Sequence, residues 1–107
     1  MLDLSRLRTI ARSADNRRHT FEAVRQINER FPAAAHDEFK ALLEDSSVPF
    51  RSKVFVLYWL REFEKFSDLV ASNEPPYATA INDVFRDVER CEEDGVDPFS
   101  VEDFPDV

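Results

Sequence analysis

Gly95 is the only glycine among the 107 residues of this chain, whereas an average protein contains about 7% glycine. Sheets built from tight hairpins need residues with positive φ, a conformation that glycine adopts at little cost. The shortage therefore disfavours all-β folds and favours α-helices joined by short polar links. It also excludes phosphate-binding loops, dinucleotide-binding turns and the nucleophile elbow of hydrolases, because each of these motifs requires more than one glycine.

Size and composition predict one soluble domain. A hydrophobic fraction of 43%, with ten phenylalanines, is ample for a single core. We expect a bundle domain over residues 1–95 and an acidic tail over 96–107. The N-terminal residues lack the apolar stretch of a secretory signal, and the longest apolar run, residues 54–60, is much shorter than the ~20 residues of a transmembrane helix. With a lone cysteine and no internal disulfide, the prediction is a cytoplasmic protein without membrane association.

Apolar residues recur at spacings of three and four in five segments, which predicts an all-α fold, a compact bundle of about five helices. The first helix is expected over Leu4–Arg12, with Asp3 as its N-cap. Thr20 is the predicted N-cap of the second. Pro32 either ends this second helix or lies in the first turn of a third one, which extends to about Asp45.

The fourth helix, expected over residues 50–70, is the centre of the predicted core. Residues 54–60 are apolar on every side, which is typical of a helix buried all round. A buried strand is the alternative, because β-branched and aromatic residues are frequent in this run; the helical spacing of the apolar residues that follow favours the helix. The side chains expected to be buried are Val56, Leu57, Trp59, Leu60 and Phe63. An exposed apolar stripe on this helix would instead predict a homodimer.

A fifth helix follows the helix-breaking residues 73–76 and ends at Gly95. Cys91 lies in phase with its apolar face, so we expect an inert thiol packed in the core. The tail that follows combines acidic residues with Phe99 and Phe104. We expect it either to fold back on the bundle or to dock on a partner.

No residue pattern predicts a metal site or a cofactor. Structural zinc needs several cysteine or histidine ligands, and this chain offers Cys91, His19 and His36. The Glu-x-x-His pair of carboxylate-bridged di-metal bundles is absent. Both histidines are interpreted as solvent-facing residues.

One pair of carboxylates has the spacing of an acid–base dyad. Asp83 and Asp87 lie four residues apart, so they share one face of the fifth helix. Arg86 and Arg90 follow them by three residues each and are expected to keep both carboxylates ionised as surface pairs. We therefore predict that the protein is not an enzyme.

The strongest functional signal is an asymmetry of charge. Residues 71–107 contain eleven carboxylates and two arginines, whereas residues 1–30 contain seven arginines and four carboxylates. Such a distribution concerns partners and association rather than fold. It favours a non-catalytic protein-binding module that presents its acidic third to a basic surface of a partner protein. The predicted partner-binding residues are Asp83, Asp87, Glu92, Glu93, Asp94, Asp97, Phe99, Glu102, Asp103, Phe104 and Asp106, and Glu89 adds to the same field.

Small acidic inhibitors of basic enzymes, such as immunity proteins, antitoxins, phage inhibitors and DNA mimics, share this size and charge, although no motif links the chain to any of them. The alternative is a nucleic-acid-associated protein that uses the seven N-terminal arginines, Arg6, Arg8, Arg12, Arg17, Arg18, Arg25 and Arg30. An overall pI of about 4.7 makes nucleic acid the less favoured partner. A third interpretation is that both charged regions are solvated faces, in a monomer or in a structural homo-oligomeric subunit.

Overall fold

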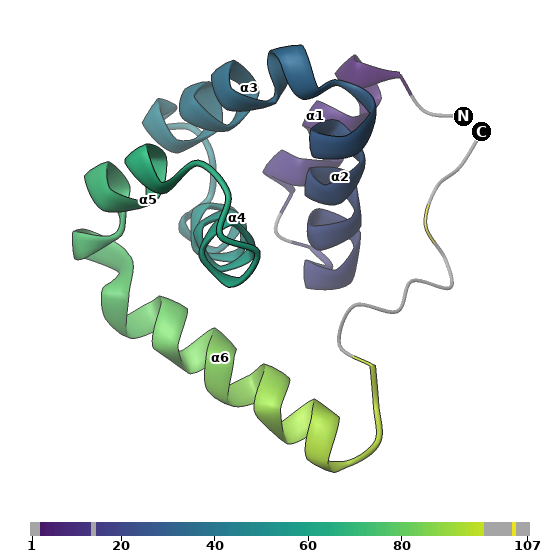
Figure 1. Ribbon diagram of the computed structural model, residues 1–107, viewed down its shortest axis with the longest axis vertical. Helices are drawn as coiled ribbons and strands as arrows, with labels where there is room; N and C mark the ends of the chain where they lie inside the picture. Colours follow the sequence, from purple (N-terminus) through teal and green to yellow (C-terminus); the bar gives the residue numbers. More distant parts are fainter. Residues whose placement is uncertain (1–2, 14, 98–103, 105–107) are drawn as a thin grey trace.

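A computed structural model describes residues 3–13, 15–97 and 104. In this part of the chain there is no strand, and six α-helices and one 3-10 helix follow in the order α1 (Leu4–Arg12), α2 (Arg17–Arg30), α3 (Pro32–Glu44), α4 (Phe50–Glu62), α5 (Ser67–Asn73), η1 (Pro75–Tyr77) and α6 (Ala78–Glu93). The other helices surround α4 (Figure 1). The predicted all-α bundle is confirmed, with one more α-helix than expected. None of the described helices is long and apolar enough to cross a bilayer.

The N-terminal helices show which capping predictions were right. α1 has its predicted bounds, and Asp3 caps it by accepting a hydrogen bond from a first-turn N–H at 2.8 Å. Asn16, not Thr20, caps α2: its side-chain oxygen accepts two first-turn N–H bonds, at 2.9 and 3.3 Å. Thr20 is buried instead, and its hydroxyl donates to the Ser13 carbonyl at 2.9 Å. Pro32 occupies the first turn of α3, the second of its two predicted positions.

Helix α4 is the core of the molecule. Residues 52–60 are all buried, and this stretch is helix rather than the alternative strand. Val56, Leu57 and Leu60 have no exposed surface and Trp59 is buried, so four of the five core predictions are confirmed. Ser52 ties α4 to α1 by donating its hydroxyl to the Arg12 carbonyl at 2.9 Å.

The predicted helix over residues 50–70 is wrong in its length, because α4 ends at Glu62. The Lys65 N–H donates to the Leu60 carbonyl at 2.8 Å and the Glu64 N–H donates to the Arg61 carbonyl at 3.3 Å. This is the Schellman arrangement that closes a helix, with Glu64 at φ 54° in the position usually taken by glycine. The chain then turns, and α5 begins at Ser67.

The turn after α4 has a packing reason. Phe66, also at positive φ, is half-buried against α3, with its ring centroid 5.9 Å from that of Phe39 and 5.3 Å from that of His36. If α4 continued straight beyond Glu62, Phe66 would lie past the edge of the bundle and be exposed to water. Phe63 lies on the outer side of the turn and is 45% exposed, so its predicted burial was wrong.

Helix α6 follows the proline-containing turn η1 and ends at Glu93, and Gly95, the predicted C-terminal stop, lies just beyond it at φ 75°. The same Schellman bonds recur here: the Val96 N–H donates to the Cys91 carbonyl at 2.8 Å, and the Gly95 N–H donates to the Glu92 carbonyl at 3.1 Å. Cys91 is half-buried rather than a core residue. Its sulfur accepts a hydrogen bond from the Arg17 guanidinium at 3.4 Å.

Candidate protein-binding surface

Helix α6 packs on the bundle through one stripe only. Ile81, Val84 and Val88 are buried, and the Phe85 ring meets the Tyr58 ring of α4 edge to face at 4.6 Å between centroids. The remaining faces of α6 point away from the bundle, and the helix runs along one side of the molecule (Figure 1). An amphipathic helix placed in this way presents its polar residues to solvent.

The predicted acidic residues of α6 and the residues just after it are all exposed. Asp83 pairs with Arg86 at 3.5 Å, as its spacing predicts. Asp87 pairs with Arg17 of α2 at 3.6 Å, and not with Arg90 as predicted. Neither contact resembles an acid–base dyad, because each carboxylate has its own arginine. The other predicted residues in the described part of the chain are Glu92, Glu93, Asp94 and Asp97, all exposed to solvent.

Four carboxylates near the C-terminal end of α6 form no ion pair with a cation in the described part of the chain. Among the described residues, no ion pair or side-chain hydrogen bond is formed by Glu89, Glu92, Glu93 or Asp94. They lie within six positions of one another, so their fields add. These carboxylates are exposed to solvent, as expected for the outer face of an amphipathic helix, and their role in binding a partner stays a prediction.

Of the two phenylalanines in the predicted tail, Phe104 lies in the described part of the chain and Phe99 does not. Phe104 is half-buried and packs against the core, and its ring meets the His19 ring of α2 edge to face at 5.7 Å between centroids. His19 is itself half-buried rather than fully solvent-facing. Four other predicted partner-binding residues lie outside the described part of the chain: Phe99, Glu102, Asp103 and Asp106.

The rival surface, built from the N-terminal arginines, is largely neutralised within the molecule. Arg8 donates to both oxygens of Glu38, at 2.5 and 2.7 Å, and joins α1 to α3. This bidentate contact raises the pKa of Arg8. Arg12 pairs with Asp45 at 2.7 Å, between α1 and the end of α3. Both arginines therefore hold helices together.

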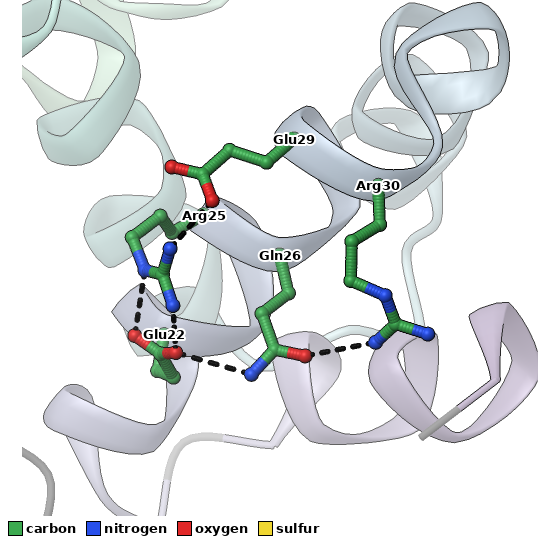
Figure 2. Close-up of polar contacts among 5 residues, drawn as sticks. All are labelled: Glu22, Arg25, Gln26, Glu29 and Arg30. Carbon is green, nitrogen blue, oxygen red and sulfur yellow. Dashed lines mark hydrogen bonds and ion pairs between the residues drawn. The ribbon is translucent and has the colours of Figure 1, made fainter. Parts of the chain in front are cut away.

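Two arginines of α2, Arg25 and Arg30, belong to a network of polar side chains along the helix (Figure 2). Arg25 donates to Glu22 and pairs with Glu29 at 2.6 Å. The hydrogen bond from Arg25 lowers the pKa of Glu22. Arg30 donates to Gln26 at 3.0 Å. Of the seven N-terminal arginines, two have side chains without an ion pair or hydrogen bond among the described residues, and these are Arg6 and Arg18.

The remaining chemistry-bearing residues in the described part of the chain do not assemble into a metal site. In the described part of the chain, no group of three His, Cys, Asp or Glu side chains is placed to hold a metal ion. His36 is tied to α5 through Asp68, at 2.7 Å from its Nε2, and this hydrogen bond lowers the pKa of Asp68. His36 was interpreted as a solvated residue, but it is half-buried and connects two helices.

Sequence reasoning missed a groove between α4 and α6. It has a volume of about 200 Å³ and is lined by Phe50, Arg51, Val54, Phe55, Ala80, Asp83, Val84 and Asp87. Phe50 is 56% exposed, the highest value among the large hydrophobic residues described as exposed, and its ring lies 5.0 Å from that of Tyr77. No sequence signal marked this residue, because Phe50 was read only as the beginning of the central helix.

Comparison with known proteins does not assign the chain to a family. No protein-family model, curated protein sequence or solved structure matches this chain at a significant level.

Proposed function

We propose that this protein is a non-catalytic protein-binding module that engages a basic surface of a partner through the exposed acidic residues of α6. The observation that carries the proposal is a contrast between the carboxylates of α6 and the N-terminal arginines. Glu89, Glu92, Glu93 and Asp94 are exposed and unneutralised among the described residues. By comparison, most of the N-terminal arginines are held by carboxylates or polar groups of the same chain.

Unneutralised charge has a defined physical effect on association. Carboxylates concentrated on one face steer a basic partner toward that face and raise the association rate, and salt screens this attraction. The overall charge of −8 strengthens the same field. An inhibitor that covers the nucleic-acid-binding surface of an enzyme uses such complementarity, and we favour this role over a purely structural one.

Binding of nucleic acid is less well supported by the described contacts. Duplex binding requires several cations that can reach phosphates together. Arg8, Arg12 and Arg25 already satisfy carboxylates, so breaking these pairs would oppose such binding. The remaining pair, Arg6 and Arg18, offers few phosphate contacts.

The test is affinity capture from a lysate of the source organism with three forms of the full chain. The first is the natural sequence and the second carries E89Q/E92Q/E93Q. The third carries D15N/D37N/E44Q, which removes the same number of exposed charges from other elements. We expect a discrete partner that is captured by the natural and control chains, is lost from the α6 variant, and dissociates as salt rises.

Three other results would contradict the proposal. Equal capture by all three chains would move the site away from α6. Capture that disappears on nuclease treatment and with R6A/R18A would support nucleic acid as the partner. A chain that captures no specific molecule would support the interpretation of α6 as a solvated face.

A further inference from the structure

The groove between α4 and α6 combines an apolar floor with an acidic wall. Val54, Phe55, Ala80 and Val84 provide apolar lining, and Asp83 and Asp87 lie on the α6 side. The two carboxylates are 62% and 58% exposed, and their arginine partners lie at the long distances of 3.5 and 3.6 Å. Exposed ion pairs of this kind are weak, so both carboxylates retain the capacity to accept a better-placed donor.

Phe50 is poorly explained by the fold alone. Its side chain is more than half exposed at the mouth of the groove, where it packs on the Tyr77 ring. An exposed phenylalanine packed on a half-buried tyrosine beside an apolar groove is typical of a protein interface, where aromatic side chains are enriched. The exposed Pro49 and Pro76 adjoin this pair in the sequence, and the exposed Arg51 follows Phe50.

One of the rings that line the groove already contacts a guanidinium of the same chain. The Arg51 guanidinium carbon lies 5.5 Å from the centre of the Phe55 ring, within the range of a cation–π contact. Arg51 lines the same groove as Phe50. An arginine combines an apolar stem with a planar cation that stacks on rings and donates to carboxylates, so it fits a groove with both kinds of lining.

We propose that this groove receives an arginine side chain of the basic partner, stacked on Phe50 and donating to Asp83. The inference rests on the proposed function and assigns the anchoring point of that interaction. The partner's arginine stem lies on Val54 and Val84, and its guanidinium lies between the Phe50 ring and the Asp83 carboxylate. The acidic residues further along α6 then attract the partner, whereas the groove fixes its orientation.

The experiment is a titration of the full isotope-labelled chain with hexa-arginine, followed by backbone NMR, with hexa-lysine as the comparison peptide. We expect the largest shifts at Phe50, Tyr77 and Asp83, and tighter binding of hexa-arginine than of hexa-lysine. F50A should weaken binding about threefold to tenfold, because it removes a cation–π contact. F63A is the matched control, since it removes another exposed phenylalanine at the opposite end of α4 and should leave the affinity unchanged.

Other outcomes separate this inference from the proposed function. Binding that is lost in E89Q/E92Q/E93Q but retained in F50A would overturn the groove and leave the acidic surface standing. Equal affinity for the two peptides would overturn the assignment of a guanidinium. A concentration-dependent dimer that F50A abolishes would assign the groove to a second copy of the chain. A chain that binds neither peptide would overturn both proposals.

Discussion

Helices α4 and α6 pack against each other, yet they use their surfaces in opposite ways. α4 is buried on every side over residues 52–60, whereas α6 buries one stripe and leaves its acidic faces in water. Both end in the same hydrogen-bonding motif, so the difference lies in packing and not in how each helix is closed. We therefore expect substitutions at the buried residues of α4 to act on the fold, and we propose that substitutions on the outer face of α6 act on binding. The predictions below test this division.

The largest expected effect comes from placing a charge in each helix. V56D should abolish the cooperative thermal transition, because an unpaired carboxylate in the centre of α4 costs free energy comparable with the ~5–15 kcal/mol stability of a small domain. V88D should retain a cooperative transition at a lower temperature, since a carboxylate in the last turns of α6 reaches water after a small shift. Circular dichroism measures both. If V88D is as unfolded as V56D, then α6 is as essential to the core as α4.

Substitutions at the C-terminal ends of the two helices should change the free energy of unfolding by smaller amounts and in opposite directions. Glu64 and Gly95 occupy equivalent positive-φ positions after α4 and α6. E64G should raise the free energy of unfolding by about 0.5 to 1 kcal/mol, because glycine removes the strain of a left-handed L-residue, less the entropy it adds to the unfolded chain. G95A should lower it by about 1 kcal/mol. A Cβ at Gly95 meets no atom within 4 Å, so this loss reports the backbone alone.

Urea unfolding checks both substitutions, and the slope of each transition should stay that of the natural chain. A loss of stability in E64G would mean that the Glu64 side chain contributes more than its backbone strain removes. Stability that does not change in G95A would show that the end of α6 frays without affecting the bundle, which would sharpen the contrast with α4.

The same helix ends show what sequence could and could not predict. Periodicity found the core of α4 and the stop at Gly95, because apolar spacing and glycine are local signals. It missed the stop at Glu64, since the residues beyond it continue a helical spacing and no glycine or proline interrupts them. What ends α4 is tertiary: Phe66 gains contacts with α3 only if the chain turns.

The candidate surface also has some features that the sequence could predict and others that it could not. The exposure of the acidic residues followed from their place on an amphipathic helix and was predictable. The choice of Arg17 as the partner of Asp87 depends on how α2 lies against α6, which no spacing within α6 reveals. Phe50 was missed because its position in the sequence indicates only the beginning of an apolar helix, and its exposure is visible only in three dimensions.

Removing charge from the outer face of α6 should change stability very little. E89Q/E92Q/E93Q should keep the free energy of unfolding within about 0.5 kcal/mol of the natural chain, with a slight gain at low salt as like-charge repulsion falls. E38Q is the contrasting control. Its carboxylate accepts two bonds from Arg8 and is 14% exposed, so it should lose about 1 kcal/mol. Urea unfolding at low and high salt measures both, and a large loss in the α6 variant would mean that these acids support the fold.

The smallest expected effect is on Tyr58, where the two helices meet. Burial, with smaller contributions from the nearby carboxylates Glu62 and Glu92, raises the pKa of Tyr58 to about 12. E92Q should lower this pKa slightly, yet leave it well above the ordinary value of 10.0. Since the folded state prefers the neutral phenol, this contribution to stability is present below pH 10 and is lost as the pH rises toward 12.

The ultraviolet absorbance of ionised tyrosine follows this titration, and Y77F removes the signal of the only other tyrosine. Urea unfolding across the same pH range should show stability falling only above pH 10. If E92Q returned the pKa of Tyr58 to its ordinary value, charge rather than burial would be the main cause of the shift. In that case α6 would be packed only weakly on α4. The contrast between the buried α4 and the exposed α6 would then be greater than their contacts indicate.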